Sequence, residues 1–169
     1  MTISDVLMIL AVLSGPVIAV QLTRYLDAKR EKRDRKLQIF KTLMATRAYT
    51  ISMDHVMTLN RIDLEFETSN PKEKEVINAW KQYLDLLSDK SISGEQWAVR
   101  RIDLLVELLH KMALVLDYDF DKTHIRNSSY SPVAHSDIES QQAKVREGVV
   151  DLLEGKRSLQ MHITNWPES

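Results

Sequence analysis

The chain has 169 residues, of which 28% are charged and 44% hydrophobic, so it fits one folded domain with at most a short appendage. This composition excludes a disordered tail and a multi-span membrane protein. The net charge of −1 argues against a specific nucleic-acid partner, and the absence of cysteine excludes disulfides, thiolate catalysis and cysteine-based zinc sites.

The first predicted element is a transmembrane anchor over residues 1–26. The run Val6–Leu22 contains no charged residue. At about 1.5 Å per residue it forms roughly 25 Å of helix, slightly less than a hydrocarbon core of about 30 Å. Including Ile3, Tyr25 and Leu26 gives a segment long enough to span a bilayer. The alternative is a hydrophobic helix buried inside a soluble protein.

A basic segment follows the anchor, and its charge predicts the orientation. Residues 24–36 contain seven basic and three acidic side chains, a net charge of +4, whereas residues 37–169 carry −4. Because positive charge stays on the cytoplasmic side, we expect the N-terminus outside and the body in the cytoplasm. An ordinary solvated helix face with internal ion pairs is the alternative. The side chains expected to contact anionic lipid headgroups are Arg24, Lys29, Arg30, Lys32 and Arg33.

Small residues recur on one face of the anchor. Ala11, Gly15 and Ala19 are spaced four residues apart, so they share a helix face. Small side chains let two membrane helices approach closely, and we therefore predict that this face is a seam for homo-oligomerisation. Pro16 cannot donate a hydrogen bond to Val12, which predicts a kink in the helix.

The remaining sequence shows helical periodicity and no sustained alternation of the kind that strands have. It predicts an all-α fold, with a basic juxtamembrane helix over 27–48 that continues the anchor and a cytoplasmic antiparallel helical bundle over 49–169. Gly155 is a natural end for the last helix. Helix starts are indicated by Ser52, Asn70-Pro71-Lys72-Glu73, Ser93-Gly94-Glu95-Gln96 and Ser136-Asp137-Ile138-Glu139.

The helix after Ser52 is expected to carry Met53, Val56, Met57 and Leu64 at helical spacing. After Ser93, apolar residues follow one another at helical spacings as far as Leu116, so this helix is expected to be the most buried. The stretch from Asp117 to His135 is the least regular, and long loops in compact domains are often functional.

Two pairs of residues are candidates for catalytic chemistry. Glu107 and His110 form one Glu-x-x-His step, but a di-iron bundle needs two such steps and two further carboxylates. Arg126 and His135 resemble the Arg-x4-6-His arrangement of helical HEPN ribonucleases, but eight residues separate them. We therefore expect no metal site, no cofactor and no enzymatic activity, with these two pairs as the alternatives.

Several segments together carry a resemblance to a known family. They are MTISDVLMILAVLSGPVIAVQLTRYL, RKLQIFKTLMATRA, IDLEF and YDFDKTHIRNSSYSPVAH. The chain resembles a bacterial family of small single-span proteins known only as a domain of unknown function. This resemblance implies an N-terminal membrane helix and a cytoplasmic helical body, and it supplies no reaction.

The sequence thus predicts a self-associating scaffold or interaction protein, anchored by a single pass in the bacterial inner membrane. Its expected partners are the lipid bilayer, further copies of the chain and an unidentified cytoplasmic protein. The first alternative is a membrane-perturbing effector of a bacterial defence-like system. The second is a HEPN-like ribonuclease or a metal-dependent bundle enzyme.

Overall fold

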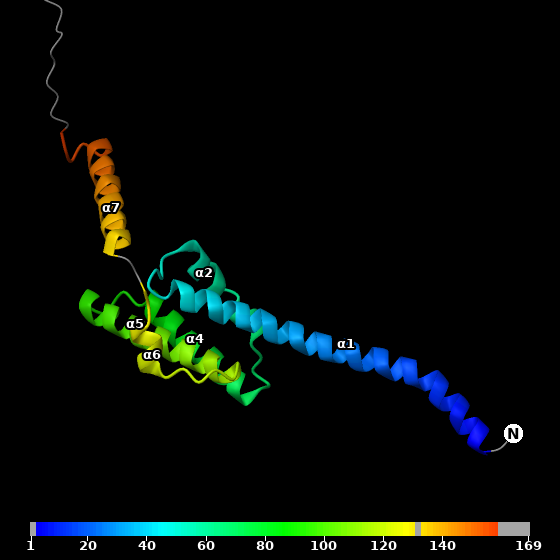
Figure 1. The fold of residues 1–169 in the computed structure, drawn as a ribbon. Helices are drawn as coiled ribbons and strands as arrows, with labels where there is room; N and C mark the ends of the chain where they lie inside the picture. The colour runs from blue at the N-terminus through cyan, green and yellow to red at the C-terminus, as the bar shows by residue number, and fades with distance from the viewer. Residues whose placement is uncertain (1–2, 131–132, 159–169) are drawn as a thin grey trace, which may run out of the picture. The chain divides into compact units, whose positions relative to one another are not determined.

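The structure is a computed structural model that describes residues 3–130 and 133–158. In these two ranges it contains seven helices and no strand, which confirms the predicted all-α class (Figure 1). The chain divides into two compact units, Met1–Ser129 and Tyr130–Ser169. The division falls inside the single helical domain expected over 49–169, and each unit is described by itself below.

The first unit begins with one long helix, α1, which runs from Ile3 to Thr46 over 44 residues. The anchor and the basic segment therefore form one continuous element. Pro16 lies inside α1, and the helix curves in its dark-blue N-terminal part (Figure 1). Near its other end α1 contributes the buried side chains of Ile39, Phe40 and Leu43 to the core.

The N-terminal half of α1 extends away from this core. Its described apolar side chains are all exposed, with Ile3 at 83% and Val12 at 68%. Among the residues that the structure describes, no helix is both long enough and apolar enough to cross a membrane. The transmembrane span therefore stays a prediction.

The next stretch forms two short helices where one was expected. α2 covers Met53–Leu59 and α3 covers Ile62–Glu65. Ser52 caps α2 as predicted, because its side chain accepts a hydrogen bond from the backbone N–H of His55. The apolar residues that mark this stretch as helical, Met53, Val56, Met57 and Leu64, are exposed, whereas His55, Thr58, Leu59 and Ile62 are buried.

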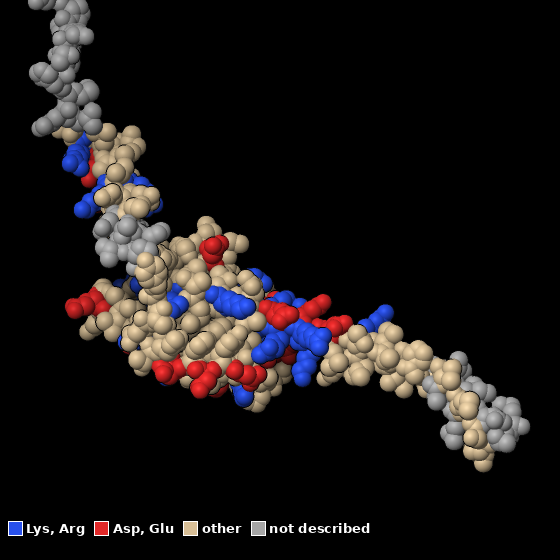
Figure 2. Space-filling model, viewed as in Figure 1, with Lys and Arg blue, Asp and Glu red and all other residues tan. Residues whose placement is uncertain are grey.

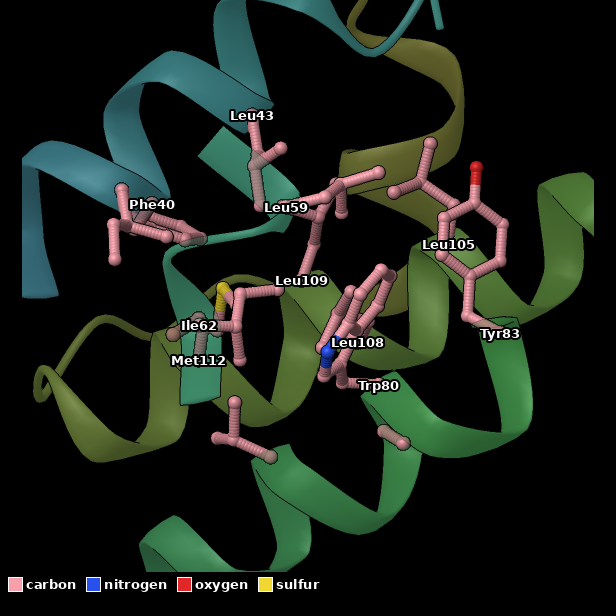
Figure 3. Packing of buried hydrophobic residues seen from close by; sticks show 14 of the residues in the cluster. Phe40, Leu43, Leu59, Ile62, Trp80, Tyr83, Leu105, Leu108, Leu109 and Met112 are labelled. Carbon is pink, nitrogen blue, oxygen red and sulfur yellow. The ribbon is translucent and has the colours of Figure 1, made fainter. Parts of the chain in front are cut away.

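Two longer helices, α4 (Pro71–Ser88) and α5 (Gly94–Val115), form most of the body. The Asn70 side chain caps α4 by accepting from the backbone N–H of Lys72 at 3.0 Å, as its sequence predicts. α5 begins after Ser93 as predicted, but the Ser93 side chain makes no capping hydrogen bond, and α5 contributes many of the buried side chains of the core. Figure 3 shows how side chains of α4 and α5 meet those of α1, α2 and α3; among them are Phe40, Leu43, Leu59, Ile62, Trp80, Tyr83, Leu108, Leu109 and Met112.

The irregular stretch after α5 is more ordered than expected. It contains a short helix, α6 (Lys122–Asn127), whose Ile125 is completely buried. Just before α6, the rings of Tyr118 and Phe120 stack against Phe40 of α1, with centroids 5.6 and 6.3 Å away. The first half of this stretch therefore covers the core and is not a free loop.

The second unit contains one helix, α7 (Val133–Leu153). It begins three residues before Ser136, so the predicted capping box lies inside the helix. Its end agrees with the prediction, because Gly155 has a positive φ of 72° and the N–H of Lys156 donates to the carbonyl of Asp151 at 2.8 Å. The apolar residues of its exposed stripe are Ile138, Val145, Val149 and Leu152.

Candidate functional site

Basic side chains of α1 hold this helix to the body. Lys36 Nζ lies 2.7 Å from Glu73 Oε1, and this pair is almost fully buried. Arg35 Nε is 2.8 Å from Glu65 Oε2. Because these contacts join α1 to α3 and to the first turn of α4, they fix the direction in which α1 leaves the body.

The five basic residues assigned to lipid headgroups are placed differently from one another. Lys32 Nζ is 3.0 Å from a carboxylate oxygen of Glu67, and Arg33 donates to the carbonyl of Leu116 at 2.9 Å. These two side chains therefore bind the body. Figure 2 shows the cluster of blue and red side chains at the point where α1 leaves it.

The other three predicted headgroup residues lie further toward the N-terminus of α1. Arg24, Lys29 and Arg30 are exposed. Arg30 makes a loose ion pair of 3.9 Å with Asp27 of the same helix. A headgroup role for these three requires no contact with the body to break, and for all five it remains a prediction.

The predicted oligomer seam lies partly outside the described side chains. Gly15 and Ala19 are exposed, and a Cβ atom added to Gly15 would have no neighbour within 4 Å. The side chain of Ala11 is among those outside the description. The described part of the seam is therefore open to a partner helix, and self-association stays a prediction.

The Glu-x-x-His step has structural partners. Glu107 Oε2 is 2.5 Å from Lys122 Nζ at the start of α6, and His110 Nδ1 lies 2.9 Å from the carbonyl oxygen of Phe120, to which it can only donate. Both side chains thus hold the segment that leads into α6. Within the described residues, no three His, Asp or Glu side chains are grouped as metal ligands would be.

The structure does not describe both side chains of the ribonuclease-like pair. Arg126 on α6 forms an ion pair with Asp103 on α5. The side chain of His135 lies outside the described part of the structure, and His135 belongs to the second unit. Arg126 therefore has a structural partner, and the pair itself stays a prediction.

The first unit contains a cleft of about 170 Å³ that no motif in the sequence indicates. Three arginines from separate segments line it: Arg47 just after α1, Arg101 on α5 and Arg126 on α6. Its apolar lining includes Leu105, Val106, Leu109 and Ile125, which are buried. The cleft thus combines three permanent positive charges with a hydrophobic floor.

The three arginines differ in how fully they are occupied. Arg47 donates to the carbonyl of Ile125 at 3.0 Å, to that of Met44, and to the hydroxyl of Ser128 at 3.1 Å. Burial lowers its pKa from the ordinary value, although a guanidinium keeps its charge at neutral pH. Arg47 is therefore mainly a structural clamp between α1 and α6.

Arg101 is less fully occupied. Its Nη1 donates to Thr50 Oγ1 at 2.7 Å, and its guanidinium lies 5.0 Å from the centre of the Trp97 ring. Its Nε is buried and has no hydrogen-bond partner among the described atoms. Arg101 makes one hydrogen bond in the described structure, whereas Arg47 makes three and Arg126 is paired with Asp103, so Arg101 is the side chain of the cleft best placed to receive an anionic partner.

A buried histidine lies in the field of the same arginine. His55 is completely buried, and its Nδ1 is 2.8 Å from Thr46 Oγ1. Burial, and after it the positive charge of Arg101, lower the pKa of His55 to about 4. His55 is therefore neutral at physiological pH and does not add a positive charge near the cleft.

Comparison with known proteins gives one finding. The model of a protein family matches the whole chain, residues 1–169. The chain belongs to this family, DUF6680, a family of unknown function. Curated proteins gave no match, and solved structures gave none. The predicted resemblance to a family of unknown function is confirmed, whereas bacterial origin and a single membrane span stay predictions for this DUF6680 chain.

Proposed function

We propose that the chain is a membrane-anchored interaction protein. The N-terminal half of α1 inserts into a bilayer and self-associates there, and the helical body binds a protein partner on the cytoplasmic side. The membrane proposed is a bacterial inner membrane, which α1 crosses once with its N-terminus outside. One observation carries the proposal: an uncharged stretch of α1 projects from the core with its described apolar side chains exposed.

The apolar side chains exposed on the N-terminal half of α1 are the reason to expect that a bilayer or another molecule buries them. Burying a side chain such as Val, Leu or Ile contributes roughly 1.5–3 kcal/mol, so a row of exposed ones is unfavourable in water. Figure 2 shows this stretch of α1 as uncharged surface beyond the charged cluster. The exposed apolar side chains described there are Ile3, Met8, Val12, Val17, Ile18, Val20 and Leu22.

The charge order along α1 supports a bilayer as that cover. The uncharged run ends at Leu22, and Arg24, Lys29 and Arg30 follow within about two turns. An apolar helix next to exposed cations suits a hydrocarbon core followed by anionic headgroups. A buried helix of a soluble protein would instead be covered by its own body, and the described side chains of this stretch are not.

The test is to place charge in the proposed span. We expect the double variant Val12→Asp with Val17→Asp to move the chain from the membrane fraction to the soluble fraction. Each aspartate at the centre of a span opposes insertion by about 2.5–3.5 kcal/mol. The measurement is the share of the chain that stays in the pellet of lysed cells after a high-salt wash.

The matched control introduces the same charges at exposed apolar positions of the body. Ile51 and Leu64 are 77% and 80% exposed, so Ile51→Asp with Leu64→Asp should leave the chain in the membrane fraction. If wild type and both double variants fractionate alike, the bilayer is not what covers α1 and the proposed anchor is wrong.

A further inference from the structure

The arginine-lined cleft has an unbalanced charge. Among its described lining residues there are three arginines and no aspartate or glutamate. Asp103 offsets part of this charge by binding Arg126, but Asp103 does not line the cleft. The remaining positive charge is concentrated at Arg47 and Arg101.

Arg101 also leaves hydrogen-bonding capacity unused. A guanidinium has five N–H donors in a planar fork, and in the described structure Arg101 donates one of them, to Thr50. The Nε donor is buried without an acceptor. Nε is out of reach of a ligand, but a carboxylate can accept two parallel hydrogen bonds from the Nη atoms at the end of the fork, which would use these donors and neutralise the charge together.

The size and lining of the cleft restrict the rest of the ligand. Its volume of about 170 Å³ is below the roughly 300–1,000 Å³ of sites for drug-sized ligands, so a nucleotide or peptide segment does not fit inside. The apolar floor offers no hydrogen bonds from its side chains; Ile102 is its exposed member, at 45%, and Leu105 and Val106 are almost fully buried. A bare phosphate would leave oxygens unpaired against this floor, whereas a short hydrocarbon chain would pack on it.

We propose that this cleft binds a small organic carboxylate, with the carboxylate on Arg101 and a short aliphatic chain on the apolar floor between α5 and α6. This inference does not depend on the proposed membrane anchor. The full-length chain is titrated with pentanoate, and binding is followed by ligand-observed NMR. We expect saturable binding of pentanoate, and at least about tenfold weaker binding of pentanol and of inorganic phosphate.

Two variants test the site itself. Arg101→Gln removes the positive charge and should weaken pentanoate binding about tenfold or more, whereas Arg100→Gln, at the exposed neighbouring position, should leave it unchanged. Ser129→Trp places a large ring in the lining while all three arginines remain, and it should abolish binding. If Arg101→Gln does not fold, Ser129→Trp decides the question.

Each contrary result overturns the inference. If pentanol bound as tightly as pentanoate, the charge of Arg101 would not contribute to binding. Phosphate binding equal to that of pentanoate would show that the apolar floor is not used. Pentanoate binding that is not saturable, or that survives Ser129→Trp, would place the ligand elsewhere or show that there is no site.

Discussion

His55 is a neutral base inside the core, and its protonation state follows from its partners. The Thr46 hydroxyl donates its one hydrogen to the carbonyl of Thr42 at 2.8 Å, so its oxygen accepts from Nδ1 of His55. The proton of the neutral ring is therefore on Nδ1, and Nε2, which has no partner in the described structure, carries a lone pair. Protonating Nε2 would create a buried donor near the positive charge of Arg101.

This histidine predicts an acid-dependent loss of stability. The pKa of His55 is about 4 in the folded protein, against 6.5 as the ordinary value. Between these two values the unfolded chain binds the proton and the folded chain does not. Stability is therefore fully present above pH 6.5 and falls as the pH drops toward 4, by on the order of 2 kcal/mol at pH 4.5.

The measurement is chemical denaturation of wild type and of His55→Gln at pH 7 and pH 4.5. Glutamine can still donate to Thr46 and does not titrate. The difference in unfolding free energy between the two proteins should shift in favour of His55→Gln at the lower pH. An equal difference at both pH values would mean that His55 titrates normally in the fold.

The Lys36–Glu73 pair predicts a large effect from one substitution. Glu73 accepts from Lys36 at 2.7 Å, and through its other oxygen from the backbone N–H of Glu67 at 2.8 Å. Lys36→Met would leave the buried carboxylate without its counter-charge. We expect a loss of about 3–5 kcal/mol in the free energy of unfolding, measured by denaturant titration.

An exposed pair on the same helix is the control. The side chains of Lys32 and Glu67 are 59% and 53% exposed. Solvent screens such a pair, so Lys32→Met should cost less than about 1 kcal/mol. Equal effects of the two substitutions would show that burial does not set the strength of the Lys36–Glu73 pair.

At this scale the candidate site could be predicted only in part. The spacing of Glu107 and His110 matches a known motif. Their partners in the structure, Lys122 and Phe120, depend on how the chain folds back on α5, which the spacing does not predict. Arg101 carried a weak signal, because it lies on the helix face of Leu105 and Leu108, where a charge is unexpected in an apolar stripe. Its approach to Arg47 and Arg126 depends on three separate segments, and no spacing along the chain predicts it.

At the scale of elements, local capping chemistry predicted two helix starts with their hydrogen bonds, whereas Ser93 makes no capping bond with its side chain and Ser136 lies inside α7. The Asn70-Pro71 cap and the Ser52 cap form because each satisfies an N–H of the first turn within a few residues. The break between α2 and α3 was missed. There Ile62 turns into the core and Leu64 turns out of it, which is a tertiary preference that periodicity does not carry.

Self-association through the small-residue face of α1 can be tested by substituting Gly15. Gly15→Leu adds a side chain on the face that is proposed to meet a second helix, so the oligomer should dissociate or shrink. Val17→Leu, on the opposite face of the helix from Gly15, is the control. Mass measured by light scattering in detergent distinguishes them, and an oligomer that is unchanged by Gly15→Leu rejects the seam.

At the scale of the molecule, the division into two units was not foreseen. α7 has helical periodicity and apolar residues, as the preceding helices do, so the sequence favoured one bundle over 49–169. The all-α class and the continuity of α1 could be predicted, because both follow from hydrophobic periodicity and from the scarcity of Gly and Pro. The end of a compact unit depends on which apolar helix faces pack against one another. The periodicity of the apolar residues does not predict this packing.

The continuity of α1 has a mechanical consequence. Between Leu22, the last residue of the uncharged run, and Lys36, the first buried tie to the body, the helix extends for roughly 20 Å without a joint. A rotation of α1 about its own axis at one end is therefore transmitted to the other end. Adding or deleting one residue in this stretch would turn the N-terminal portion by about 100° relative to the body. The number of residues between Leu22 and Lys36 thus sets the rotation, about the helix axis, of the N-terminal portion relative to the body.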